Sequence, residues 1–244
     1  MVLPLDMPDE YPWLPGSGRS QLGDLGELAS RLGSIVTYDR RGSVYWFEDF
    51  ENGIEGIFPQ TSGVGAEVRL THKYVFRGLL SAKLTGGSDS TLSAGILKRI
   101  APALLTTYGL EATVSVESDV DFIRLGFQYN TGITRYNGAF YIDVTTQKLY
   151  YLSNAFTLVV IDSALIEDND PTLFFTAKVV IDLVNNKYIR ALFNQTEYDL
   201  TNIGIYSVAD TTIPRIEASV FCFSVSGSNG IAYVDNIIVT VGDP

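Results

Sequence analysis

The chain of 244 residues is 46% hydrophobic and 12% aromatic, which excludes a disordered protein and is enough for a substantial core. Its 17 basic and 28 acidic residues give a net charge of −11. A negative surface repels phosphate groups, so nucleic acids and anionic membranes are not expected as partners. Cys222 is the single cysteine, so no disulfide forms within the chain, and we expect it to be a small buried hydrophobe.

Residues 1–33 are predicted to form a first unit, an extended N-terminal arm followed by a helix. Proline stands at positions 4, 8, 12 and 15, which prevents a helix or a central strand over residues 1 to about 20. An arm with many apolar side chains is ordered only when something holds it. We therefore expect it to contact its own domain or a neighbouring subunit through Leu3, Leu5, Tyr11, Trp13 and Leu14.

One short helix is predicted between Ser20 and Leu32, where leucine or alanine recurs every three or four residues until Gly33 ends the pattern. The first residues show neither the basic segment nor the apolar segment of a signal peptide. No apolar run reaches the ~18 residues of a membrane span. We expect neither export by a signal peptide nor insertion into a membrane.

From Ser34 to Pro244 the chain consists of short alternating apolar and polar runs separated by polar turns, which is typical of β-strands. The glycine-rich stretch 51–65 is expected to be a loop. A dozen or more such strands predict an all-β fold, an antiparallel jelly-roll β-sandwich over residues 34–244. The predicted strands cover residues 35–38, 44–50, 79–84, 96–100, 108–116, 122–129, 139–144, 149–152, 157–161, 173–183, 189–193, 216–225 and 231–241.

The clearest hairpin joins the strand 173–183 to the strand 189–193, with two asparagines at its tip. A two-residue loop, 185–186, would place Asp182 opposite Ile189. A three-residue loop, 185–187, would place Leu183 opposite Ile189 and Asp182 opposite Arg190. We favour the second register because it pairs like with like, and a slip of one residue moves every side chain to the other face.

Three blocks of the sequence resemble carbohydrate-binding-module jelly rolls of the concanavalin A-like kind. Residues 50–53, FENG, are similar to the opening FExG of such modules, and residues 76–84, FRGLLSAKL, to one of their strands. Residues 229–240, NGIAYVDNIIVT, resemble their closing strand with its YxDNIxV ending. The 173–200 hairpin is also similar to one in laminin G-like and lectin-like sandwiches. The resemblance spans about residues 46–241, and the first 45 residues lie outside it.

In these modules the opening glutamate and the closing aspartate lie side by side and often hold a structural calcium. Carried over, this names Glu51 and Asp235 as metal ligands. Ca²⁺ binds several oxygen ligands, and two carboxylates with backbone carbonyls would supply them. In the other interpretation Asp235 caps a turn and Glu51 is solvated.

Modules of this kind also stack sugars on aromatic rings, along the concave sheet or at loop tips. Aromatic residues crowd the stretch 127–151. The resemblance therefore implies a ligand site made by Tyr129, Tyr136 and one of Tyr150 or Tyr151. In the other interpretation these rings pack in the core or at a subunit contact, where tyrosine is also favoured.

No set of catalytic residues is predicted. Glu117, Asp119 and Asp121 alternate in VESDVDF, and paired carboxylates can hydrolyse glycosides. Lectin-like glucanases carry a similar pattern with a different spacing, and no tryptophan lies nearby, so a hairpin tip explains these acids more simply. His72 is the single histidine, and no Ser-His-Asp, zinc or phosphate-loop motif is present. We therefore expect no enzymatic activity.

Two interpretations of function are open. In the first, the chain is a non-enzymatic structural protein of an assembly, a phage virion component such as a capsid decoration protein, whose arm contacts other subunits of a homo-oligomer. The arm, the missing export signal and the missing catalytic set motivate it, together with fold-level analogy. The alternative is a carbohydrate-binding module or a receptor-binding lectin-like domain. The expected location is the virion, or otherwise the cytoplasm or the extracellular space.

Overall fold

The computed structural model describes residues 39, 41–54, 56–89, 91, 93–100, 105–166 and 170–244. The chain divides into two compact units, Met1–Arg40 and Arg41–Pro244. The predicted arm, the predicted helix and the predicted strand 35–38 lie outside the described residues, as do the proposed contact residues Leu3, Leu5, Tyr11, Trp13 and Leu14. The strands of the described residues all belong to the second unit.

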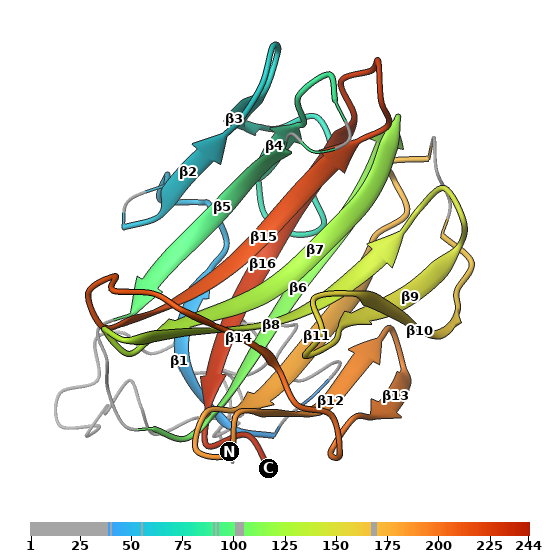
Figure 1. Ribbon diagram of the computed structural model, residues 1–244. Coiled ribbons are helices and arrows are strands. Elements are labelled where there is room, and N and C mark those ends of the chain that lie inside the picture. Colours follow the sequence, from blue (N-terminus) through green and yellow to red (C-terminus); the bar gives the residue numbers. More distant parts are fainter. Residues whose placement is uncertain are drawn as a thin grey trace, which may run out of the picture. The chain divides into compact units, whose positions relative to one another are not determined.

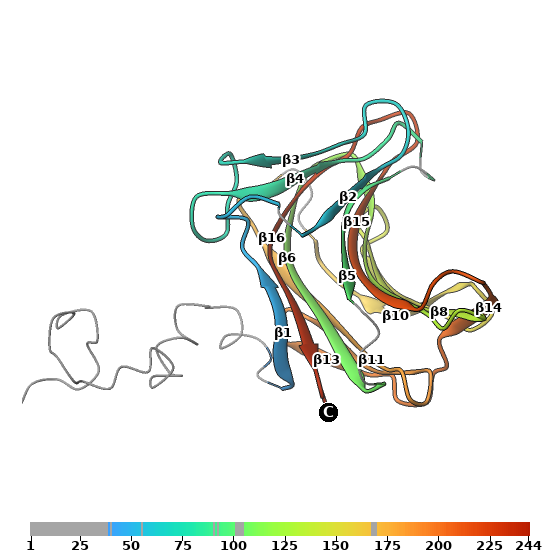
Figure 2. The ribbon, with the colours of Figure 1, turned by 90° about the vertical axis from the view of Figure 1, so that its left-hand side faces the viewer.

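Two antiparallel eight-stranded sheets pack face to face in this unit (Figures 1 and 2). Sheet A has the order β13-β12-β11-β6-β16-β4-β3, with β1 paired to β16. It contains β1 (Ser43–Glu48), β3 (Glu67–Thr71), β4 (Ser81–Thr85), β6 (Thr107–Ser118), β11 (Phe175–Asp182), β12 (Lys187–Phe193), β13 (Thr196–Asp199) and β16 (Ile231–Val241).

Sheet B has the order β10-β9-β8-β7-β15-β5-β2, with β14 paired to β8. Figure 2 shows that sheet B bends away from a flat plane, so that its outer face is concave. Sheet B contains β2 (Phe58–Thr61), β5 (Ser93–Ile100), β7 (Val120–Asn130), β8 (Thr134–Asp143), β9 (Lys148–Leu152), β10 (Leu158–Ser163), β14 (Tyr206–Ala209) and β15 (Arg215–Ser224).

The core lies between the inner faces of the two sheets, and alternation along each strand decides which side chains enter it. On β7, Ile123, Leu125 and Phe127 are buried in the core cluster, and on β15 Val220 and Cys222 are buried there too. Burial raises the pKa of the Cys222 thiol to about 12, and the residue is free of any disulfide. This confirms the predicted all-β antiparallel sandwich and the role of Cys222 as a buried hydrophobe.

The first and last described strands of the unit meet, as a jelly roll requires. β1 pairs with β16, with Phe47 opposite Ile238, and β16 also pairs with β6 and β4 in the middle of sheet A. The predicted range 231–241 coincides with β16. No helix in the described residues has the length and apolar character needed to cross a membrane.

Four strands were not predicted from the sequence: β2, β3, β13 and β14. The stretch predicted to be a glycine-rich loop contains β2, which lies at one edge of sheet B. β3 and β13 lie at the two edges of sheet A, and β14 pairs with β8 alone. All four are short, and none of their residues is fully buried. An edge strand with little burial has no core to impose an alternating pattern on its sequence.

Neither predicted register of the β11–β12 hairpin is correct. Asp182 lies opposite Lys187, and Arg190 lies opposite Val180 rather than opposite Asp182. A β-bulge between Val180 and Ile181 shifts the pairing by one residue. The loop therefore has four residues, 183–186, and the last of them is an asparagine with φ 54°, in the left-handed region expected for the tip.

The acidic stretch 117–121 is a turn between sheets rather than the predicted hairpin tip. β6 belongs to sheet A and β7 to sheet B, and these two strands do not pair with each other. Asp119 makes the bend, with φ 55°. The chain therefore passes from one layer of the sandwich to the other at this point.

Candidate functional site: the groove of sheet B

A continuous row of side chains crosses the concave outer face of sheet B. Strand pairing sets Phe221 of β15 opposite Arg124 of β7, and Arg124 opposite Tyr141 of β8. The row continues through the paired residues of β5 and β2 on one side and of β9 on the other. We call its large side chains the aromatic wall: Gln60, Phe221, Arg124, Tyr141 and Tyr150.

A second row, two residues along each strand, has small side chains on β15, β7 and β8 and continues on β5 with Leu97, opposite Ser219. Ser219, Gly126 and Ala139 face one another on β15, β7 and β8, and we call them the floor. Beyond the floor a third row is large again, and we call it the polar wall: Arg99, Glu217, Gln128 and Asn137. Rows two residues apart are about 7 Å from each other, so the walls stand roughly 13 Å apart across a floor with little side-chain volume.

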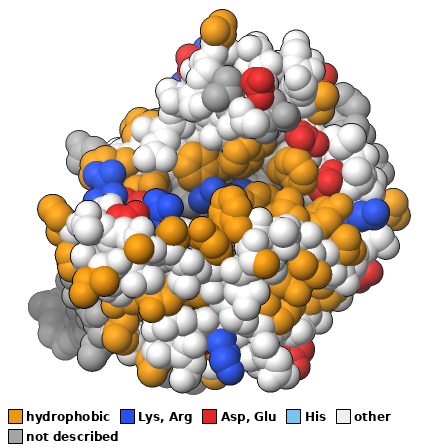
Figure 3. Space-filling model, in the orientation of Figure 1, with side chains coloured by type: hydrophobic (Ala, Val, Ile, Leu, Met, Phe, Trp, Pro, Cys, Tyr) orange, Lys and Arg blue, Asp and Glu red, His pale blue; other side chains and the backbone are white. Residues whose placement is uncertain are grey.

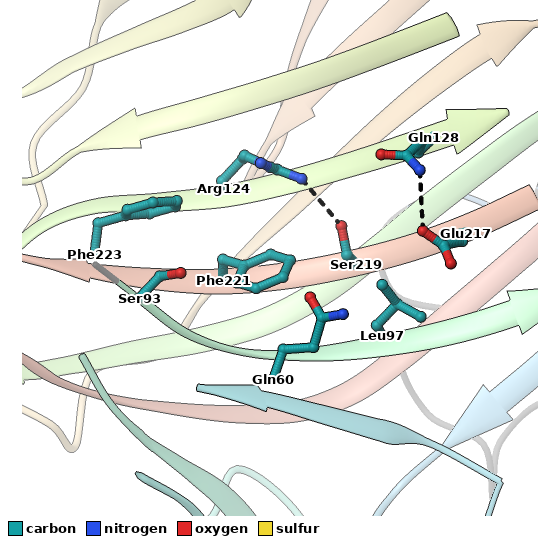
Figure 4. A pocket seen from close by; sticks show the side chains of 9 residues that line it. All are labelled: Gln60, Ser93, Leu97, Arg124, Gln128, Glu217, Ser219, Phe221 and Phe223. Atoms are coloured by element: carbon teal, nitrogen blue, oxygen red, sulfur yellow. Dashed lines mark hydrogen bonds between the residues drawn. The ribbon is translucent and has the colours of Figure 1, made fainter. Parts of the chain in front are cut away.

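This alternation of large and small rows hollows the sheet. One cavity of about 470 Å³ is lined by residues of both walls and the floor (Figure 4). A second, of about 210 Å³, continues over β8 and shares Arg124 and Gln128 with the first. Figure 3 shows the hollow across this face, with hydrophobic and basic side chains gathered in it. The two cavities form one groove that crosses the strands.

Phe221 lies flat over β5 because that strand has a glycine beneath it. A Cβ on Gly95 would stand 2.3 Å from Cδ1 of the Phe221 ring, so no other residue allows the ring to lie there. The guanidinium carbon of Arg124 sits 5.0 Å from the centre of the same ring, in a cation–π contact. Residues of the two strands that flank β15, Gly95 and Arg124, therefore fix the position of the ring beside the floor of the groove (Figure 4).

The carboxylate of the polar wall is engaged by neighbouring side chains. Glu217 accepts hydrogen bonds from Nε of Arg99 at 3.0 Å, Nε of Arg215 at 2.6 Å and Nε2 of Gln128 at 3.2 Å. Arg135, at the end of the second cavity, pairs with Asp210 at 3.1 Å. Each of these three arginines therefore has an acidic partner within the fold.

The four tyrosines that the resemblance implied do not share one face. Tyr129 and Tyr136 stack on each other at 6.0 Å and pack against the core. Tyr151 also packs against the core and contacts Tyr188 edge-on at 5.9 Å. Tyr150 lies on the concave face, beside Tyr141. Of the four, Tyr150 alone lies on the concave face, in the row of the aromatic wall, and it lines neither cavity.

The sequence contains a pattern that indicates the groove residues. The crowding of aromatic residues in the stretch 127–151 did not point to it. On β7 the apolar residues alternate with Arg124, Gly126 and Gln128, and on β15 with Glu217 and Ser219. These outward positions carry polar or small side chains, whereas the aromatic Tyr129 shares its parity with the core residues. Parity along each strand points to the groove residues, because neighbours on a strand face opposite sides.

Glu51 and Asp235 come together at a loop of sheet A and hold its backbone. Oε1 of Glu51 accepts from the N–H groups of Leu79 and Leu80 at 2.6 and 2.8 Å. Oδ2 of Asp235 accepts from those of Phe76 and Arg77 at 2.9 and 3.1 Å. The three blocks that carry the family resemblance therefore meet in one place, where their acids anchor the loop 76–80.

These contacts leave little for a calcium ion. Ca²⁺ takes six to eight oxygen ligands, and here amide donors occupy Oε1 of Glu51 and both oxygens of Asp235, whose Oδ1 accepts from Asn236. In the described residues no three His, Cys, Asp or Glu side chains are grouped so that they could hold a metal ion. Calcium binding stays a prediction from the family resemblance. The hydrogen bonds that the oxygens of Glu51 and Asp235 accept do not favour it.

The environment of Asp235 is unusual for a carboxyl group. The side chain is fully buried, and burial raises its pKa to about 6 although three backbone N–H groups act in the opposite direction. The nearby charge of Glu51 makes a smaller contribution to the same rise. The loop anchor therefore contains an acid that titrates at mildly acidic pH.

The acids of the 117–121 turn point to different partners. Glu117 accepts hydrogen bonds from Lys73 and from the hydroxyl of Tyr233, and these lower its pKa although burial raises it. Asp121 accepts from Thr145 at 3.2 Å, on the sheet B side. They do not form a pair of carboxylates facing one ligand.

A comparison with protein-family models finds no match for this chain, and a comparison with curated proteins finds none either. Solved structures share the fold. An endo-β-1,4-glucuronan lyase from the fungus Trichoderma reesei has a TM-score of 0.56 at 12% identity, over 82% of this chain and 96% of that one. The Emp47p carbohydrate recognition domain has a TM-score of 0.52 at 11% identity, over 84% and 98%. A sialidase has 0.52 at 9% identity, over 83% of this chain and 19% of that one. Identities this low show a common fold and no more.

Proposed function

We propose that this chain binds carbohydrate in the groove of sheet B. The observation that carries the proposal is the combination of a fixed aromatic ring, Phe221, with hydrogen-bonding side chains on both sides of a floor of small residues. Ligand sites are concave and combine apolar surface with a few placed polar groups. The long groove with an amide on each wall, Gln60 and Gln128, suits a ligand with many hydroxyl groups.

The likeness to other structures supports the fold on which this groove is built. Their names refer to carbohydrates, but identities of 9–12% transfer no activity. The lining of the groove in this chain is what supports binding. We propose no catalytic role, because the carboxylate of the polar wall, Glu217, is engaged by two arginines and a glutamine.

The test is glycan-array screening followed by calorimetry on two groove variants, Phe221→Ala and Tyr141→Ala. Each should lower affinity about tenfold or more, since aromatic residues at the centre of a site carry much of its binding energy. Tyr45→Ala is the matched control, because Tyr45 is an exposed aromatic residue on β1 of the other sheet. Retained binding in both groove variants, with thermal melts showing folded protein, would place the ligand elsewhere.

A second candidate function is the structural role in an assembly, such as a virion, and β10 is the observation that favours it. β10 is the outermost strand of sheet B. Its residues Leu158, Val159 and Val160 are 38%, 37% and 50% exposed. An exposed apolar edge strand is a template for pairing with another chain, and proteins usually protect such edges with charge or proline.

This second proposal predicts concentration-dependent self-association through β10. Val159→Lys should abolish it, because a lysine on the edge strand opposes pairing, and Val64→Lys is the control at a loop residue that is 81% exposed. Sedimentation velocity measures the effect, and mass spectrometry of isolated particles asks whether the chain is present in them. A wild-type chain that stays monomeric and is missing from every particle would remove this role.

A further inference from the structure

The groove contains a cation that the described residues leave without an acidic partner. Arg124 lies in the aromatic wall at the junction of the two cavities. Its only hydrogen bond within the described residues is a long one, 3.5 Å from Nη2 to Oγ of Ser219. Its guanidinium otherwise rests on the ring of Phe221. Neither of these contacts balances its positive charge.

The other arginines of the same face each contact an acidic partner. Arg99 and Arg215 both donate to Glu217, and Arg135 pairs with Asp210. Among the described residues no carboxylate lies within salt-bridge distance of Arg124. The chain has 28 acidic residues and a net charge of −11, so acids are not scarce.

The position of the Arg124 side chain makes the lack of an acidic partner unfavourable for the stability of the fold. Arg124 is half-buried on a central strand, and its Nε is buried without a hydrogen-bond partner in the part of the chain that the structure describes. The Nε lies over Gly126, since a Cβ built there would be 3.4 Å from it. A partly buried charge and an unmade hydrogen bond both disfavour folding unless a partner is supplied. A ligand can supply that partner.

We infer that the groove binds an acidic sugar whose carboxylate pairs with Arg124. This inference rests on the proposed carbohydrate binding and names the class of ligand. The planar fork of a guanidinium matches a carboxylate in geometry and gives strong charge-assisted hydrogen bonds. The pyranose ring beside that carboxylate would lie against Phe221, with Gln128 within reach of its hydroxyl groups across the floor.

The overall charge of the chain shapes the expected ligand further. A net charge of −11 repels a densely charged polymer at long range, whereas a contact inside a groove is screened less by salt. The groove should therefore prefer one carboxylate per sugar to the dense charge of a sulfated chain. Salt should change the affinity little, unlike binding to a broad basic patch.

The experiment compares polygalacturonate with its methyl ester by calorimetry on the full chain. The two polymers differ in charge and share their ring, so the ester isolates the carboxylate. Wild-type protein should bind the acid form roughly ten- to hundredfold more tightly, the loss expected for a charged hydrogen bond. Arg124→Ala should erase this preference, Arg124→Lys should keep part of it, and Arg69→Ala, an exposed arginine on β3, should keep all of it.

The outcomes separate this inference from the proposed function. Equal binding of acid and ester, abolished by Phe221→Ala, would overturn the acidic ligand and leave a neutral glycan site. Binding of dextran sulfate, which carries sulfate groups and no carboxylate, in place of polygalacturonate would overturn the carboxylate and assign a sulfate instead. No binding to any polymer on the array would overturn both. If Arg124→Ala fails to fold, the comparison of acid with ester on wild-type protein decides the question.

Discussion

Lys178 and Arg190 on the outer face of sheet A differ from Arg124 on that of sheet B in whether the described residues give them an acidic partner. On sheet A, Lys178 and Arg190 point outward and are 2% and 3% exposed. Both pair with Asp243, Lys178 at 2.7 Å, and Thr240 donates to the same carboxylate at 2.7 Å. On sheet B, Arg124 points outward into a groove, and no described residue offers it such an acid.

The difference shows what an alternating pattern can and cannot say. In both sheets the charged residue occupies the outward parity of an apolar strand. The second residue from the C-terminal end supplies the partner on sheet A, so a contact far away in sequence decides that this charge is structural. No described residue supplies one on sheet B, which leaves the charge for a ligand. The candidate site therefore lies where the described residues do not compensate the charge of Arg124.

Removing the shared acid of sheet A should have the largest effect. Asp243→Ala leaves two buried cations without this counter-ion, and breaking a buried ion pair costs about 3–5 kcal/mol of unfolding free energy. Urea denaturation measures the loss. Glu67→Ala is the matched control, since it removes an exposed acid whose pair with Arg69 spans 3.6 Å, and it should cost less than about 1 kcal/mol. Equal effects of the two variants would show that Asp243 does not stabilise the fold as a buried counter-ion.

The buried acid of the loop anchor should produce the next largest effect, a dependence on pH. The pKa of Asp235 is raised from its ordinary 3.8 to about 6 in the folded chain. The folded state therefore holds this proton more tightly, so its contribution is fully present below pH 3.8 and is lost as pH rises through 6. A shift of this size corresponds to about 3 kcal/mol.

The measurement for Asp235 is a difference between two pH profiles of the unfolding free energy. Asp235→Asn cannot titrate, so the wild-type profile should fall relative to that of the variant between about pH 4 and 6. The difference between the two profiles isolates Asp235. Acids with lowered pKa values, such as Asp182, make the unfolding free energy rise with pH, and they do so equally in both proteins. Parallel profiles would show that Asp235 has an ordinary pKa.

On sheet B the smaller steric change Gly95→Ala tests the support of the groove. The added methyl would stand 2.3 Å from the Phe221 ring and must displace it. Overpacking of this kind costs about 1–3 kcal/mol, and glycan affinity should fall with it because the ring leaves its position. Gly204→Ala is the control, since its nearest atom would be 4.0 Å away. Unchanged affinity in Gly95→Ala would mean that the ring takes no part in binding.

The sequence predicted the long central strands well and the geometry between them poorly. The strands β15 and β16 follow from alternation, because both bury one face in the core. The β11–β12 register does not follow, since the bulge at Val180 leaves no mark in the apolar pattern. The neighbours of each strand decide two features of the groove. One is the row that joins Phe221 to Arg124, and the other is the absence of a described acid beside Arg124. A single sequence does not show which distant strands pair.

The smallest effect is expected at the loop anchor of sheet A, from calcium. Backbone amides already occupy the oxygens of Glu51 and Asp235, so adding Ca²⁺ or a chelator should leave the melting temperature unchanged. An ion at a hundred times its Kd would add about 2.7 kcal/mol and raise the melting temperature by several degrees. Such a rise, if Glu51→Gln removed it, would establish the metal that the family resemblance implies. It would also show that this face, like the groove of sheet B, leaves a charge for an outside partner to balance.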